Sequence, residues 1–166
     1  NKNALAASTQ RDLIAGEVSK DLTRRILLPE KISKAHDEGI LHFHDADYFI
    51  QPIFNCCLIN IGDMLDNGTV MNGKLIESPK SFQVACTVVT QIIAAVACSQ
   101  YGGQSVDIRH LGKYLRKSRV KFEDHFRKAC SELSDEEIKK LVEDRIQDEL
   151  RSGVQTIQYQ INTLMT

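Results

Sequence analysis

Apolar residues recur at helical spacing along most of the chain and form short runs near its middle. Steps of three and four predict helices over residues 9–28, 30–38, 78–100, 107–128 and 135–164. Alternation over Ile40–His44 and an apolar run over Cys57–Ile61 predict two strands. The glycines and asparagines of residues 62–74 predict a turn-rich loop or a hairpin. The pattern therefore indicates an α/β chain dominated by helices.

Four boundary signals support these helices. Thr9 with Asp12 is typical of a helix start, and Ser78 before Pro79 is a good N-cap for the next long helix. Asp107 or Ser105 caps the third, and Ser134–Glu137 has the spacing of a capping box. The helix that follows is predicted to run about 45 Å. Long helices of this kind favour a bundle, within the chain or between two chains.

The predicted helix over 78–100 is apolar on most sides, which is typical of a buried helix. Gln91 is its one unexpected polar residue, and we expect it to be buried with a hydrogen-bonding partner. Cys86 and Cys98 are predicted to be small core residues. The helix after it carries a strongly basic face from Lys113 to Lys128, which is either a solvated face or a surface that attracts phosphates.

Composition narrows the class of protein. The 166 residues carry 21 Lys and Arg against 22 Asp and Glu, so we expect one domain and no nucleic-acid partner. The sequence has no apolar run long enough to span a membrane, so no membrane association is predicted. The five cysteines include an adjacent pair, which favours a reducing cytoplasm over a disulfide framework. The start without Met and the stop within an apolar stretch indicate a piece of a longer protein.

The chemically rich stretch is His42-Phe-His-Asp-Ala-Asp-Tyr48, followed by Asn55-Cys-Cys-Leu58. His-x-His at a strand end begins several hydrolase metal sites. However, the other histidines (His36, His110 and His125) lie on predicted helices without a second ligand at the right spacing. His36 is more simply explained by the last turn of its helix, where a cation suits the dipole. We therefore predict no metal on this chain.

Thiol chemistry is the second possibility for this stretch. Cys56 or Cys57 would be reactive if it were exposed near a cationic group. Adjacent side chains of a strand point to opposite faces, so only one of the two can face a site. The alternative, that both are core cysteines, stays open at this point.

Further motifs stand in a fixed order along the chain. They are Asp12-Leu-Ile-Ala-Gly16, the His42–Tyr48 stretch, Pro52-Ile-Phe-Asn-Cys-Cys-Leu58, Ser99-Gln-Tyr-Gly-Gly-Gln-Ser105 and Gly153-Val-Gln-Thr-Ile-Gln-Tyr-Gln-Ile-Asn-Thr-Leu-Met-Thr166. Together they resemble the catalytic domain of anaerobic (class III) ribonucleoside-triphosphate reductases, across essentially the whole chain.

The resemblance implies that residues 1–166 are the N-terminal part of a ten-stranded glycyl-radical-type α/β barrel with long dimerisation helices. The activity implied is the reduction of ribonucleoside triphosphates to 2′-deoxyribonucleoside triphosphates by glycyl and thiyl radicals, with formate as reductant. A separate iron–sulfur, S-adenosylmethionine-dependent activase installs the glycyl radical. The glycyl segment, the thiyl cysteine and a zinc site are expected outside residues 1–166, as is the ATP cone.

The resemblance also assigns residues. The first cysteine of the Asn-Cys motif is Cys56, implied to help reduce the substrate radical. Next to it, Asn55 is expected to bind the ribose, as are His44 and Asp45. Deoxynucleoside triphosphate or ATP effectors are implied at a homodimer interface made of helices, with Glu77, Gln91 and Lys121 as the expected contacts.

Two other classes of function stay open. The chain could be a helical dimerisation and effector-binding module without chemistry of its own, or part of another glycyl-radical enzyme with a different substrate. Because no radical site is expected among residues 1–166, the chain alone is predicted to be inactive as a reductase.

Overall fold

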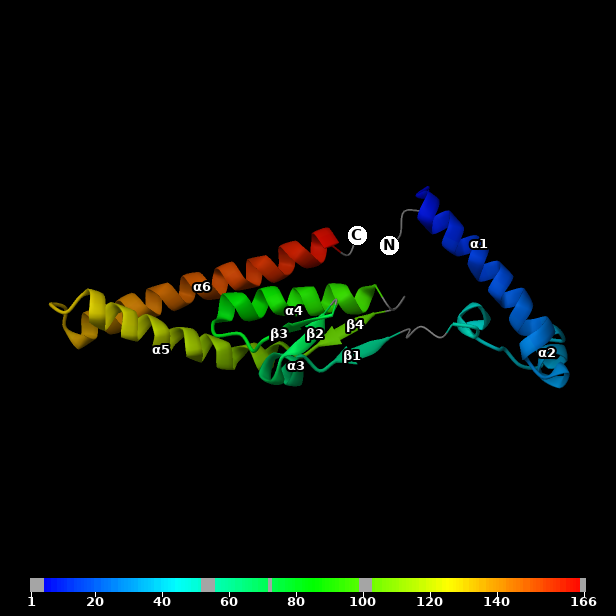
Figure 1. The fold of residues 1–166 in the computed structure, drawn as a ribbon, viewed down its shortest axis with the longest axis horizontal. Coiled ribbons are helices and arrows are strands. Elements are labelled where there is room, and N and C mark those ends of the chain that lie inside the picture. Colours follow the sequence, from blue (N-terminus) through cyan, green and yellow to red (C-terminus); the bar gives the residue numbers. More distant parts are fainter. Residues whose placement is uncertain (1–4, 52–55, 72, 99–102, 165–166) are drawn as a thin grey trace. The chain divides into compact units, whose positions relative to one another are not determined.

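The computed structural model describes residues 5–51, 56–71, 73–98 and 103–164 (Figure 1). The chain divides into two compact units, Asn1–Phe54 and Asn55–Thr166. Each unit has its own set of elements.

The first unit is built from helices. Helix α1 (Ala7–Leu22) continues into a π-helical turn η1 (Thr23–Leu27), and α2 (Glu30–Asp37) and a short 3₁₀ turn η2 (Ala46–Tyr48) follow. Pro29 caps α2, and Gly39 follows its end with a left-handed φ of 72°, which glycine adopts without strain. The end of α2 was therefore predicted correctly. The predicted start of α1 was wrong, because Ala6 is the N-cap and makes no side-chain cap bond.

The predicted strand Ile40–His44 is also wrong. The amides of Ile40 and Leu41 both donate to the Ala35 carbonyl, at 2.9 and 3.2 Å, and this contact closes the turn after α2. The amide of Phe43 donates to a ring nitrogen of His36 instead of to a neighbouring strand. Alternation alone could not form a strand here, since a strand needs a partner for its backbone groups.

The second unit alternates short strands with long helices. Its elements are β1 (Cys57–Ile59), α3 (Ile61–Asn67), β2 (Thr69–Met71), β3 (Lys74–Ile76), α4 (Phe82–Ala97), β4 (Gln104–Val106), η3 (Ile108–Leu111), α5 (Gly112–Ala129) and α6 (Asp135–Leu164). Strands β1 and β4 pair in parallel, with Leu58 opposite Ser105. Strands β2 and β3 form the predicted hairpin. Helix α3, capped by Asn60, was not predicted.

Helix α6 runs along both α4 and α5 (Figure 1). It packs tightly against α4 at Gly153, where an added Cβ would lie 2.4 Å from Phe82 Cε1 and 2.9 Å from Cys86 Sγ. One apolar cluster fills the space around α4, and a second lies between α5 and α6. Their most buried large members, at 2% exposure or less, include Ile61, Leu65, Val89, Ile92, Tyr114 and Ile146.

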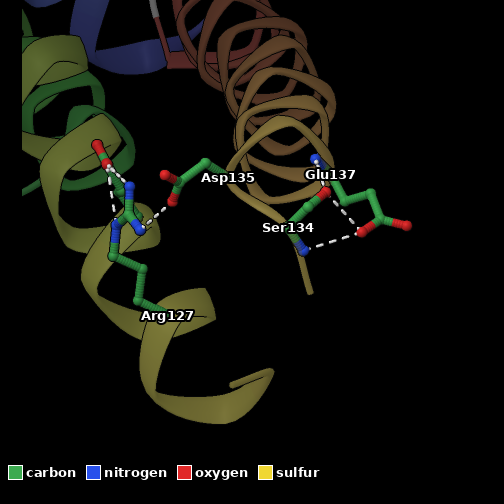
Figure 2. A network of polar contacts seen from close by, with 5 residues as sticks. Arg127, Ser134, Asp135 and Glu137 are labelled. Atoms are coloured by element: carbon green, nitrogen blue, oxygen red, sulfur yellow. Dashed lines mark hydrogen bonds and ion pairs between the residues drawn. The ribbon is translucent and has the colours of Figure 1, made fainter. Parts of the chain in front are cut away.

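The start of α6 confirms the predicted capping box (Figure 2). The Glu137 carboxylate accepts from the amide and hydroxyl of Ser134, at 2.9 and 2.7 Å, and the Glu137 amide donates to the Ser134 hydroxyl at 3.4 Å. The guanidinium of Arg127, near the end of α5, joins Glu123 to Asp135. These contacts fix the turn between the two long helices.

The helix-dominated α/β class is thus confirmed. The described residues form two two-stranded sheets, so the ten-stranded barrel stays a prediction. Helix α4 starts at Phe82 with Ser81 as its cap, three residues later than predicted. Within the described residues, no helix is both long and apolar enough to cross a membrane.

Candidate functional site

A polar cavity of about 380 Å³ lies within the first unit. Helix α1 and its π-helical turn contribute Lys20 and Arg24, which are four residues apart, and α2 contributes His36. The irregular segment 42–47 supplies the rest of the wall: His42, Phe43, His44, Asp45, Ala46 and Asp47. The predicted site residues His44 and Asp45 therefore lie in one cavity.

The polar groups of this segment contact one another in sequence. Atom Nε2 of His42 lies 3.2 Å from Nδ1 of His44, and Nε2 of His44 lies 3.2 Å from Oδ1 of Asp45. Nδ1 of His36 accepts the Phe43 amide at 3.2 Å. The ring centroids of His36 and His42 are 5.4 Å apart, as are those of His42 and His44. Four titratable side chains thus follow one another along the wall of the cavity.

Asp45 has an unusual backbone. Its φ is 53°, in the left-handed region, and among the described residues other than glycine it alone has a positive φ. Aspartate tolerates this region better than most residues, and such conformations are enriched at functional sites. The turn at Asp45 places the carboxylate against the imidazole that precedes it.

The cavity wall carries charges of both signs. The ammonium group of Lys20 contacts Glu17 at 2.8 Å, and this hydrogen bond raises the pKa of Lys20 above its ordinary value, with a smaller contribution from Asp47. The guanidinium of Arg24 pairs with Asp37. Both cations are thus already paired, and Asp45 and Asp47 add negative charge to the wall, so the cavity suits a polar, hydrogen-bonding ligand more than a purely anionic one.

The adjacent cysteines open the second unit and differ in burial. Cys56 is exposed, whereas Cys57 is half-buried and packs against the core around α4. The amide of Cys57 donates to the Gly103 carbonyl at 3.1 Å, which begins the pairing of β1 with β4. The difference in burial does not come from strand alternation, because Cys56 lies just before β1, so the facing of one cysteine toward a site stays a prediction. Asn55, the predicted neighbour of Cys56, lies outside the described residues.

The family model for anaerobic ribonucleoside-triphosphate reductase matches residues 1–166, the whole chain. The chain belongs to this reductase family.

Named relatives agree with the family assignment. The anaerobic ribonucleoside-triphosphate reductases of Salmonella typhimurium and Escherichia coli are each 36% identical to it over 167 residues. The protein of the same name from Enterobacteria phage T4 is 36% identical over 171 residues. Each alignment covers 100% of this chain but only 23% of the two bacterial proteins and 27% of the phage protein. The chain spans about a quarter of the length of these curated relatives.

The three expected effector contacts of this reductase-family chain are all exposed. Glu77 follows β3, Gln91 lies on α4 and Lys121 on α5. The expectation that Gln91 is buried is wrong, because α4 leaves one side uncovered. The buried polar residue is its neighbour Thr90, which is 3% exposed and donates to the Thr87 carbonyl at 2.8 Å. The hydroxyl of Thr90 also contacts the Gln160 side chain on α6.

Cys86 on α4 and Cys98, the residue that follows α4, also differ. Cys86 is buried, as predicted, and desolvation, with the charge of Glu149, raises its pKa to about 12. Cys98 is exposed, so its assignment to the core is wrong. A buried, protonated thiol at Cys86 is suited to packing and not to nucleophilic chemistry.

The basic face of α5 is partly neutralised. Lys113 pairs with Asp66 of α3, and Arg119 with Glu143 of α6 at 2.7 Å. Asp66 also accepts from the hydroxyl of Tyr114 at 3.1 Å, and the Lys113 contact lowers the pKa of Asp66. These pairs support the interpretation that the basic side of α5 is a solvated face over much of the helix. Among the described residues, no group of three or more His, Cys, Asp or Glu could hold a metal ion.

Sequence reasoning missed three residues of the cavity, namely Lys20, Arg24 and His36. Lys20 and Arg24 are four residues apart, a spacing that puts side chains on one face of a helix. His36 was assigned to the helix dipole alone. Its proximity to the His42 stretch, with only a glycine-containing turn between, is the signal that would have placed it beside His42.

Proposed function

We propose that this chain is part of an anaerobic reductase that converts ribonucleoside triphosphates into 2′-deoxyribonucleoside triphosphates. The observation that carries the proposal is the match of the family model over all 166 residues. The exposure of Cys56, next to a cysteine that packs into the core, supports it further.

In the proposed reaction, one formate and one proton supply the two reducing equivalents. The 2′ C–O bond breaks, a C–H bond forms in its place, the oxygen leaves as water and formate becomes carbon dioxide. The glycyl radical, installed by an iron–sulfur, S-adenosylmethionine-dependent activase, supplies the one-electron chemistry when present. On this chain, Cys56 would give a hydrogen atom to the substrate, because a thiol S–H bond is weak. Neither the zinc site nor the glycyl radical is assigned to residues 1–166.

The first experiment compares the two cysteines in the complete reductase. We expect Cys56→Ala to abolish formation of deoxynucleotides from a ribonucleoside triphosphate, formate and the activase. Cys57→Ala is the matched control, since it removes a similar group from the neighbouring residue, which packs against the core. It should lower the free energy of unfolding by about 1 kcal/mol and keep its turnover. Inactivity of Cys57→Ala with normal turnover of Cys56→Ala would reverse the assignment.

The 166-residue chain by itself should form no deoxynucleotide under the same conditions. The proposal puts the radical residues elsewhere in the reductase, so the chain lacks the group that begins the reaction. Product formed by this chain, verified by chromatography against a deoxynucleotide standard, would contradict the proposed division of the active site. It would equally count against reading residues 1–166 as the N-terminal part of one barrel domain.

We also propose a regulatory role for the second unit. The helices from Ser78 to Lys128 would pair with a second copy and hold a deoxynucleoside triphosphate, with Glu77, Gln91 and Lys121 as contacts. The exposure of these three residues supports this role, because a ligand can reach them. A ligand that binds only the folded dimer raises the free energy of unfolding by about 2.7 kcal/mol at a hundredfold excess over Kd.

Thermal shift and sedimentation with the four deoxynucleoside triphosphates test this role. A nucleotide-dependent shift that Gln91→Ala removes would favour it. A monomer that no deoxynucleotide stabilises would leave the effector site without support, and would favour a reductase piece or another glycyl-radical enzyme.

A further inference from the structure

The three imidazoles of the cavity differ in how many of their nitrogens are engaged. Both nitrogens of His44 have contacts, Nδ1 with His42 and Nε2 with Asp45. His42 uses Nε2 only, and His36 uses Nδ1 only, to accept the Phe43 amide. Within the described residues, Nδ1 of His42 and Nε2 of His36 are therefore available to a ligand, whereas both nitrogens of His44 are already engaged.

For neutral imidazole rings, the contacts also define which nitrogen of each ring carries the proton. A carboxylate only accepts, so Nε2 of His44 carries the proton that faces Asp45. Nδ1 of the neutral His44 ring is then an acceptor, and Nε2 of His42 must be the donor to it. His42 is left with an unprotonated Nδ1. His36 accepts at Nδ1, so its proton is on Nε2.

We propose that His36 and His42 are the residues of this cavity that bind the ribose hydroxyls, and that His44 is a positioning residue. Asp45 orients His44, and His44 in turn holds the tautomer of His42. The cavity then offers an acceptor on one ring and a donor on another, with ring centroids 5.4 Å apart. A hydroxyl group both donates and accepts, so a vicinal diol matches this pair. The assignment of ribose rests on the function proposed above.

The electrostatics of the wall agree with a neutral, hydroxylated group such as ribose. Lys20 and Arg24 face the cavity from α1 and η1, and Asp45 and Asp47 face it from the segment after α2. The two cations are already paired, with Glu17 and Asp37. Hydrogen bonds aligned from Asp45 through His44 to His42 polarise one another, which strengthens the acceptor at Nδ1 of His42.

A double-mutant cycle separates a positioning role from direct contact. The readout is the Kd of a ribonucleoside triphosphate for the complete, unactivated reductase, measured by titration calorimetry. We expect His42→Ala to weaken binding about tenfold and His44→Ala about fivefold. Because His44 acts through His42, the double variant should bind about as weakly as His42→Ala alone. A loss of about fiftyfold in the double variant, the product of the single effects, would overturn the proposal.

A second test replaces His42 with asparagine or glutamine, because each amide side chain reproduces only one of the two ring nitrogens. His42→Asn keeps an acceptor at the position of Nδ1 and loses the contact with His44, whereas His42→Gln keeps a donor at the position of Nε2. We expect His42→Asn to bind ribonucleotide more tightly than His42→Gln. The reverse order would show that His42 only supports its neighbours, and would overturn its assignment as a ligand contact.

Controls separate folding and turnover from binding. Lys34→Ala on α2, an exposed residue of the same helix as His36, should leave Kd unchanged. Thermal denaturation of each variant shows whether a loss of binding is a loss of fold, and the His42→Asn and His42→Gln pair keeps the test valid if an alanine variant unfolds. A wild-type reductase that binds ribonucleotide without reducing it, once activated, would refute the proposed function alone. A wild type that binds no ribonucleotide would overturn the ribose assignment.

Discussion

The two units of the chain bury different amounts of apolar surface. Among the described residues of Asn1–Phe54, only Thr23 and Ala46 are buried, while Leu13 and Ile14 on α1 are 61% and 67% exposed. In Asn55–Thr166, helices α4, α5 and α6 close over two apolar clusters. Stability from hydrophobic burial is therefore concentrated in the second unit. The first unit holds its irregular segment with hydrogen bonds and ion pairs and keeps its imidazoles accessible.

Truncating one apolar side chain in each unit should give the largest difference in stability between the two units. Ile146 is 2% exposed between α5 and α6, so Ile146→Ala should lower the free energy of unfolding by about 2–5 kcal/mol. Leu13→Ala, its control on α1, should change the free energy of unfolding by less than about 0.5 kcal/mol. Urea denaturation followed by circular dichroism measures both. Equal losses would mean that the first unit has a core that its exposure does not reveal.

Glycine substitutions test how tightly the helices of the second unit pack. Gly153→Ala forces a Cβ against Phe82 and Cys86, so we expect a loss of about 1–3 kcal/mol in the free energy of unfolding. Gly112→Ala at the start of α5 is the matched control. Its nearest neighbour would be Arg116 Nη1 at 3.8 Å, an ordinary contact, and alanine is the better helix former. A Gly153→Ala variant as stable as Gly112→Ala would show that α6 can move away from α4.

The cap of α6 is expected to contribute less. Ser134→Ala removes the hydroxyl that accepts from the Glu137 amide and donates to the Glu137 carboxylate. The expected loss in the free energy of unfolding is about 1 kcal/mol, and Ser134→Asp should restore most of it. Thermal denaturation of the two variants checks this. No difference between them would mean that the packing of α6, and not its cap, sets where the helix begins.

The sequence pattern predicted an element correctly where the signal for it lies in neighbouring residues. The capping box at Ser134 and the glycine stop after α2 need only neighbouring residues, and both were predicted. Ile40–His44 failed because a strand requires a partner that the local pattern cannot supply. The prediction that Gln91 and Cys98 are buried was wrong. Which side of α4 stays uncovered depends on how α6 and other distant segments pack against it. The same holds for the candidate site. His44 and Asp45 were predicted because they stand in one motif, whereas Lys20 and Arg24 were missed because they reach the cavity from another part of the sequence.

The smallest expected effect is a change in titration. The Arg109 side chain, with the Arg109 amide, lowers the pKa of Asp107 from its ordinary 3.8 to about 2. The stabilisation from this charge is complete above pH 3.8 and is lost as the pH falls through 2. Carbon-13 NMR of the carboxyl group should follow this titration. Arg109→Gln should raise the pKa but leave it below 3.8, because the amide at residue 109 still donates; an unchanged pKa would point to another cause.

The parallel pairing of β1 with β4 has a kinetic consequence. The hairpin of β2 and β3 joins neighbouring residues and can close in about 1–10 μs. Cys57 and Gln104, by contrast, are separated in the sequence by a long stretch that includes α3 and α4. Contacts so distant in sequence form slowly, since the entropy of closing the loop must be overcome first. We therefore expect the backbone amides that pair β1 with β4 to gain hydrogen-exchange protection later during refolding than those of α5 and α6.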